Sequence, residues 1–179
     1  MKPVITAQTM RRCEEINFAA GSADALELMY IAGRGCFEIF RKFMAAHGFF
    51  RRVVIFAGSG NNGGDGVVIA DFFARQEKYE VVLALASEKN KLSPAGTFYL
   101  AKLSEKVTVC SADDVELQNG DCIVEALLGT GCRAPMREPY RSLIGRINAA
   151  ALPVLSVDLP AGLGSTGRAA ALIQPIKLL

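Results

Sequence analysis

The stretch VVIFAGSGNNGGDGVVIADFFARQ, residues 53–76, decides the fold class. It opens with a short β-branched run typical of a buried strand, passes through five glycines within nine residues, and closes in a helical pattern of apolar side chains. A strand, a tight loop and a helix in direct succession form the first half of a βαβ unit. The sequence therefore predicts a parallel α/β sheet with a glycine-rich loop at the carboxyl end of its first strand.

Patterns of the same kind continue on both sides of this stretch. Two helices are expected before it, at about residues 6–20 and 22–47, with Ser22 as the N-cap of the second. After it we expect strands at 81–86, 107–110, 122–126 and 154–157, and helices at 94–103 and 139–149. Right-handed crossovers with one reversal of winding give the strand order 3-2-1-4-5. The expected fold is a Rossmann-like, doubly wound, three-layer αβα sandwich that forms one domain over residues 1–179.

Composition narrows the class of protein. Hydrophobic residues make up 51% of the 179 and charged residues 21%, which is typical of a soluble enzyme-like domain. The net charge of +2 is spread along the chain, so no nucleic-acid partner is expected. The apolar runs are shorter than the roughly 18 residues of a membrane span, and no signal peptide is visible, which favours a cytoplasmic protein without membrane contact.

The five cysteines contain no C-x-x-C pair, which disfavours a disulfide framework or a zinc cluster. Cys132 sits in a glycine-rich loop and is the cysteine whose thiol we would test for reactivity.

Three glycine-rich loops follow the first, fourth and fifth strands, and the expected topology brings them to one edge of the sheet. The loop at 58–66 offers backbone N–H groups at a helix N-terminus, an arrangement that favours phosphate. An ordinary NAD-dependent dehydrogenase is disfavoured, because Glu88 is the only acidic residue near the end of the second strand and lies off the ideal position. P-loop chemistry is excluded by the absence of a Gly-Lys-Ser/Thr sequence.

Two carboxylates end strands beside these loops. Glu125 ends the fourth strand and Asp158 follows the fifth, and both are expected to point into one crevice as acid, base or cation ligand. Asp158 could instead only cap a turn. His47, the sole histidine, is expected to complement the C-terminus of its helix, which leaves no Ser-His-Asp triad or histidine metal site.

The motifs AGSGNNGGDG, EALLGTG and VDLPAGL, at residues 57–66, 125–131 and 157–163, together with LMYIAG at 28–33, resemble those of the YjeF N-terminal domain family, the NAD(P)H-hydrate epimerases. The resemblance runs from about residue 6 to 167. It implies an isomerase that interconverts the R and S epimers of hydrated NAD(P)H in nicotinamide nucleotide repair, so that a partner dehydratase can restore the cofactor. It also implies a homodimer with one potassium ion per subunit.

Site residues follow from the same resemblance. Asp158 would be the catalytic residue, and Asn62, Glu125 and Ala161 would lie at the potassium site. The substrate-binding residues would be Asn61, Asn62, Gly63, Gly64, Asp65, Gly129, Thr130, Gly131, Cys132, Arg133, Ala134, Pro135 and Asp158.

The chain departs from the family pattern at four places. Glu125 stands where the family usually has aspartate, Ala161 where it has serine, and Tyr30–Ile31 where it has glutamate-asparagine before alanine-glycine. The chain also stops after AAALIQPIKLL where the family continues, so we expect an incomplete carboxyl end. The altered Glu125, Ala161 and carboxyl end favour an alternative function, a non-catalytic nucleotide-binding or protein-interaction module derived from the family. A conventional nicotinamide oxidoreductase is a third, weaker alternative.

Overall fold

The computed structural model describes residues 7–21, 24–48, 50–88, 91–132 and 135–163. Five strands form one sheet: β1 (Arg52–Ala57), β2 (Glu80–Leu85), β3 (Val107–Ser111), β4 (Asp121–Ala126) and β5 (Val154–Ser156). Every pairing is parallel and the order is β3-β2-β1-β4-β5, which confirms the predicted fold class and topology. The helices are α1 (Ala7–Ala19), α2 (Ala25–His47), α3 (Asn61–Arg75), α4 (Pro94–Ala101) and α5 (Tyr140–Ala149), with short 3₁₀ turns η2 (Ala112–Asp114) and η3 (Gly129–Gly131).

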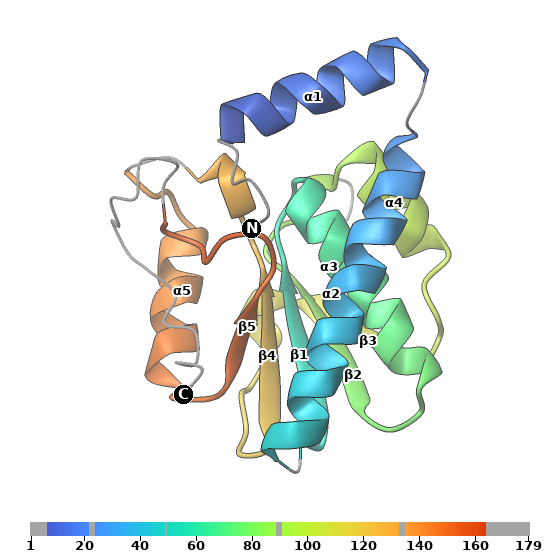
Figure 1. Ribbon diagram of the computed structural model, residues 1–179. Helices are drawn as coiled ribbons and strands as arrows, with labels where there is room; N and C mark the ends of the chain where they lie inside the picture. The colour runs from blue at the N-terminus through green and yellow to red at the C-terminus, as the bar shows by residue number, and fades with distance from the viewer. Residues whose placement is uncertain (1–6, 22–23, 49, 89–90, 133–134, 164–179) are drawn as a thin grey trace.

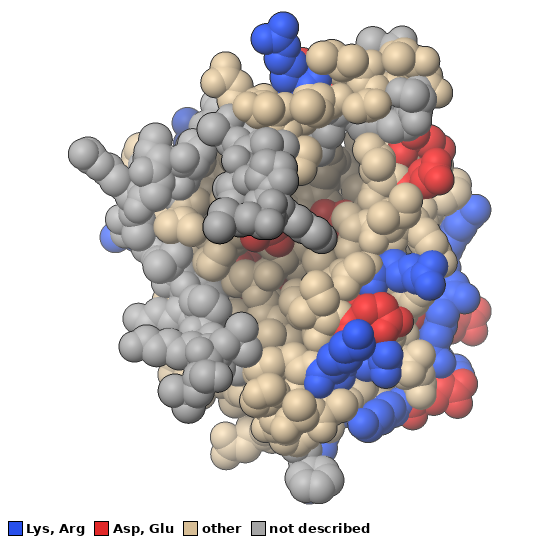
Figure 2. Space-filling view, viewed as in Figure 1, with Lys and Arg blue, Asp and Glu red and all other residues tan. Residues whose placement is uncertain are grey.

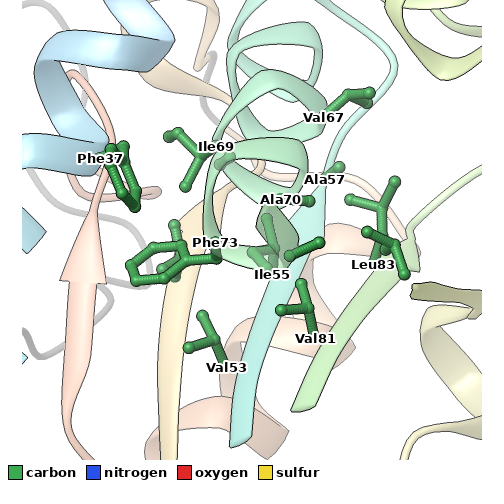
Figure 3. Packing of buried hydrophobic residues seen from close by; sticks show 14 of the residues in the cluster. Phe37, Val53, Ile55, Ala57, Val67, Ile69, Ala70, Phe73, Val81 and Leu83 are labelled. Carbon is green, nitrogen blue, oxygen red and sulfur yellow. The ribbon is translucent and has the colours of Figure 1, made fainter. Parts of the chain in front are cut away.

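The alternation of side chains along β1 creates the three layers. Val53, Ile55 and Ala57 project to one face of the sheet, where they pack with Phe73 of α3 and Phe37 of α2 (Figure 3). Val54 and Phe56 project to the other face, into a cluster that contains the buried side chains of α5. The sheet is therefore covered on both faces, which explains why β1 is an uninterrupted apolar run from Val53 to Ala57.

The carboxyl ends of the central strands are level with one another. Ala57 at the end of β1 pairs with Leu85 of β2 on one side and with Ala126 of β4 on the other. The loops that follow these strands consequently leave the sheet at the same edge. Helix α1 lies across this side of the molecule, at the top of Figure 1.

An ion pair ties the opposite edge together. The guanidinium of Arg52 donates to both carboxylate oxygens of Asp121, at 2.9 and 2.7 Å, and Asp121 also accepts the backbone N–H of Gln118. Asp121 is almost fully buried, so this two-point contact stabilises the amino ends of β1 and β4 where a charge would otherwise lack a partner.

Two local predictions were wrong. Helix α3 begins at Asn61, so the second half of the glycine-rich stretch is helix rather than loop. The N-cap of α2 is Asp24, whose carboxylate accepts the N–H of Leu26; Ser22, the predicted cap, lies outside the described residues.

The expectation of an incomplete carboxyl end concerns residues 164–179, which lie outside the described residues. Within the described ranges, none of the helices has the length and apolar character needed to cross a bilayer.

Candidate functional site

The glycine-rich loops after β1 and β4 are packed directly against each other. A Cβ atom on Gly58 would lie 1.9 Å from the backbone oxygen of Leu127, and one on Gly63 would lie 1.8 Å from the backbone oxygen of Gly58. Gly64 and Gly66 are also in close contact, with Met29 and Ala126. Gly58, Gly63 and Gly66 are therefore required by the packing of the chain itself, whereas the Met29 side chain can move away from a Cβ on Gly64.

The N-terminus of α3 is open. Its N-cap, Gly60, supplies no side-chain hydrogen bond, and a Cβ there would meet nothing within 4 Å. The helix is 15 residues long and has no acidic side chain in its first turn. Its first N–H groups and the positive end of its dipole are thus available for an anionic group.

Asn62, in the first turn of α3, carries a buried side-chain amide. Among the described residues, neither its Nδ2 nor its Oδ1 has a hydrogen-bond partner. The amide lies beside the loop after β4, because a Cβ on Gly129 would be 3.2 Å from Cγ and 3.3 Å from Oδ1 of Asn62. A buried amide without partners is costly unless a ligand or ion satisfies it.

Asp158, after β5, lies against the loop that follows β4. Its Oδ2 accepts the backbone N–H of Thr130 at 2.8 Å, and the same oxygen would lie 2.6 Å from a Cβ on Gly129. The residue is exposed and has a φ of 63°, in the left-handed region that few side chains adopt. Residues held in this way concentrate at functional sites. Figure 2 shows acidic atoms, in red, in the hollow near the middle of this face.

Glu125, at the end of β4, is fully buried. Its Oε1 accepts the N–H of Leu127 at 2.8 Å and its Oε2 accepts that of Ala161 at 3.0 Å, so the carboxylate bridges the loops after β4 and β5. Burial raises the pKa of Glu125, and the negative charge of Asp158 raises it further, against the lowering effect of the two backbone donors. The two carboxylates are thus close enough to interact, but only Asp158 is open to solvent.

The oxygen atoms of Asn62 and Glu125 are of the kind that binds a hard cation. The side-chain oxygen of Asn62 is unpaired, and no lysine or arginine forms an ion pair with Glu125 among the described residues. Carboxylate, amide and backbone oxygens are the ligands that such cations prefer. No group of three or more His, Cys, Asp or Glu side chains within the described ranges could hold a metal ion, so any ion here would depend on neutral oxygens as well.

The remaining predicted substrate-binding residues are spread around this centre. Asn61 and Asp65 line a cavity of about 130 Å³ between α2 and the start of α3. Thr130 and Cys132 are half-buried, whereas Gly131 and Pro135 are exposed. Arg133 and Ala134 lie outside the described residues.

Two further residues lie at this site although no sequence pattern pointed to them. The hydroxyl of Tyr140, from α5, lies 3.3 Å from Oγ of Ser59 and accepts the Ser59 N–H at 3.4 Å. Cys36 of α2 is half-buried, and its pKa is raised by burial first and then by the charges of Asp65 and Asp158. Neither residue belongs to a motif, because each is brought in by a helix distant in sequence.

Comparison with known proteins places this geometry in a family. The model of the YjeF-related protein N-terminus matches residues 25–177. The NAD(P)H-hydrate epimerase of Rhodopirellula baltica is 31% identical over 93% of this chain and 71% of that protein. The bifunctional NAD(P)H-hydrate repair enzyme Nnr of Salinibacter ruber is 33% identical over 91% of this chain, which spans 33% of that enzyme.

A solved structure shows the same fold. The crystal structure of yeast ynu0 aligns with a TM-score of 0.76 and 26% sequence identity, over 90% of this chain and 72% of the yeast chain. The range matched by the family model, residues 25–177, contains the strands, the glycine-rich loops and both carboxylates. The chain therefore belongs to the family of YjeF-related N-terminal domains.

Proposed function

We propose that this protein is an NAD(P)H-hydrate epimerase, an isomerase that interconverts the R and S epimers of hydrated NADH or NADPH. The observation that carries the proposal is the exposed carboxylate of Asp158, held by the N–H of Thr130 next to the open N-terminus of α3. Relatives named as epimerases or as bifunctional repair enzymes, at 31–33% identity, support it.

Each half of the substrate has a counterpart in this site. The pyrophosphate is anionic and suits the uncapped N–H groups at Asn61 to Gly63. The loop from Gly129 to Pro135 would contact the dinucleotide beside them. The hydrated ring would then lie near Asp158, whose carboxylate serves as general acid and base by moving a proton to and from the ring substituent.

A potassium ion at Asn62, Glu125 and Ala161 is part of the proposal. The unpaired Oδ1 of Asn62 and the buried carboxylate of Glu125 fit a cation, and the backbone of Ala161 already contacts Glu125. Such an ion would supply positive charge to the site. Asn62 and Glu125 would hold it, and Glu125 would keep the loops after β4 and β5 together.

We also propose a dehydratase as the functional partner, since a repair process needs a step that removes the added water once the epimers interconvert.

We further propose that the protein forms a homodimer, because large apolar side chains are exposed on one helix. Leu28, Tyr30, Ile31 and Ile39 of α2 are exposed by 38 to 66%. Sedimentation equilibrium of the full chain distinguishes a dimer from a monomer.

The direct test supplies the R epimer of hydrated NADH or NADPH together with a dehydratase specific for the S epimer. The recovered absorbance of the reduced nicotinamide is followed in potassium and in tetramethylammonium buffers. Exchange faster than the spontaneous rate is expected, and Asp158→Asn should abolish it while the thermal melting temperature stays the same. Glu105→Gln, which changes an exposed carboxylate at the amino edge of the sheet, is the matched control.

A second candidate function is a nucleotide-binding module without turnover. The observation that favours it is that both oxygens of Glu125 already accept backbone N–H groups, which leaves fewer lone pairs for an ion. Binding of the hydrated dinucleotide without acceleration of exchange would support this module and contradict the epimerase. Full exchange activity in Asp158→Asn would contradict the role given to that carboxylate.

A further inference from the structure

A second hollow lies at the same edge of the sheet, beyond the glycine-rich loop from Asp158. It has a volume of about 710 Å³ and is bounded by the residues that follow β2 and β3 and by the start of α5. This volume lies within the usual range of small-molecule pockets. Its polar lining is formed by Ser87, Glu88, Lys91, Ser111, Asp113 and Tyr140.

Tyr140 connects this hollow to the site already described. Its ring lines the hollow, and its hydroxyl contacts both the N–H and Oγ of Ser59, directly before the N-cap of α3. The hollow and the open helix N-terminus are therefore neighbours. Tyr140 thus borders the hollow on one side and the residue before the N-cap of α3 on the other.

The strand order sets the direction in which a ligand would extend. Asp158 follows β5, the open helix N-terminus follows β1, and Glu88 follows β2, in a sheet ordered β3-β2-β1-β4-β5. The three intervals from β5 to β2 correspond to about 14 Å at the usual strand spacing. A dinucleotide whose pyrophosphate lies at α3 would thus have one end at Asp158 and the other in the hollow.

The charges around the hollow favour an adenosine ribose with a free 2′-hydroxyl over one with a 2′-phosphate. Glu88 and Asp113 supply two carboxylates, and the one lysine of the lining, Lys91, is paired with Glu88 at 3.3 Å. A carboxylate at the end of the second strand can accept hydrogen bonds from ribose hydroxyls. A 2′-phosphate carries a charge of about −2 and would be repelled by the same groups.

We propose that this hollow receives the adenosine end of the hydrated dinucleotide, and that Glu88 binds its ribose 2′-hydroxyl and so selects hydrated NADH over hydrated NADPH. The proposal rests on the proposed function for the identity of the dinucleotide. The nicotinamide end then lies at Asp158. The choice between a 2′-hydroxyl and a 2′-phosphate on the adenosine ribose is made at Glu88, on the other side of the loop after β1.

The first test measures binding without any reaction. Adenosine 5′-monophosphate and adenosine 2′,5′-bisphosphate are titrated into the full-length protein by calorimetry. We expect the monophosphate to bind at least about tenfold more tightly than the bisphosphate. The bisphosphate lacks the 2′-hydroxyl that donates to Glu88, and its 2′-phosphate is repelled by the carboxylates of the hollow. In Glu88→Gln this preference should shrink about tenfold, because Lys91 is released to the phosphate as the carboxylate is removed. Glu105→Gln should leave the preference unchanged.

A second variant tests the place of binding. Ser87→Trp puts a large ring into the hollow at a partly buried residue and should abolish binding of both nucleotides with an unchanged melting temperature. Equal affinity of the wild type for the two nucleotides, or undiminished binding in Ser87→Trp, would overturn the proposal.

The epimerase assay separates this proposal from the proposed function. If the nucleotides bind as expected but no exchange of epimers occurs, the hollow keeps its assignment and the epimerase activity is refuted. If exchange occurs while Glu88→Gln leaves the ratio of KM values for hydrated NADH and NADPH unchanged, the activity holds and the role of Glu88 is refuted.

Discussion

The carboxylate of Asp158 lies so close to Gly129 that a Cβ atom on Gly129 would be 2.6 Å from its Oδ2. The loop after β4 therefore positions the group that we place at the reacting ring, through this contact and through the N–H of Thr130. Any side chain at position 129 must displace Asp158, Asn62 or both.

Gly129→Ala should accordingly destabilise the protein and reduce its activity together. The φ of 52° at Gly129 costs an alanine about 1 to 2 kcal/mol, before the displacement of Asp158 is counted. Chemical denaturation and the epimer-exchange assay measure the two effects. Gly21→Ala is the control, since Gly21 also has a positive φ but a Cβ there meets nothing within 4 Å; an equal loss of activity in both variants would contradict the proposed contact.

The glycines of the first loop should divide into two classes. Gly63→Ala places a Cβ 1.8 Å from the backbone oxygen of Gly58 and should prevent stable folding, as judged by circular dichroism and solubility. Gly60→Ala meets open space and should fold with an unchanged melting temperature, yet bind adenosine 5′-diphosphate more weakly, because the added methyl group stands where the phosphate would approach. Unchanged binding in Gly60→Ala would argue against an anion at this helix.

Asn62→Leu should leave the ligand-free protein as stable as before, or more stable by about 1 kcal/mol, because it removes a buried amide that has no partner among the described residues. It should also remove any increase in melting temperature produced by potassium over tetramethylammonium. Asn119→Leu, at an exposed asparagine, should keep that increase. A large destabilisation of ligand-free Asn62→Leu would show that the amide has a structural role instead.

The cysteines should differ in reactivity in a way that depends on pH. Burial raises the pKa of Cys122 to about 12, with a smaller contribution from Asp121. At pH 8 only about one molecule in 10⁴ would carry the thiolate that reacts with iodoacetamide. Mass spectrometry should find the exposed Cys13 alkylated first and Cys122 only after unfolding. Comparable rates at these two thiols in the native protein would contradict the structure.

The fold was predictable because its signals are local. The short β-branched runs, the helical periods between them and the right-handed crossover rule are enough to give the order β3-β2-β1-β4-β5. The start of α3 was missed because asparagine, aspartate and glycine are poor helix formers, whereas here Gly63 and Gly66 are required by close contacts of the helix with Gly58 and Ala126.

The candidate site was predictable only in part, for the same reason. The number of glycines at 58–66 suggested close approach to a ligand, but most of them accommodate Leu127, Gly58, Met29 and Ala126. Tyr140 and the hollow beside it could not be predicted, since the contact with Ser59 joins residues 81 positions apart and depends on the final placement of α5.

The contact of Gly58 and Gly63 with neighbouring backbone also limits how the specificity of such a protein can be redesigned. A side chain added at either of these two glycines should cost the fold before it can alter ligand choice. A library intended to change the accepted nucleotide should therefore keep Gly58 and Gly63 fixed and vary Ser87, Glu88, Lys91 and Ser111, whose side chains border solvent and lie away from this backbone contact.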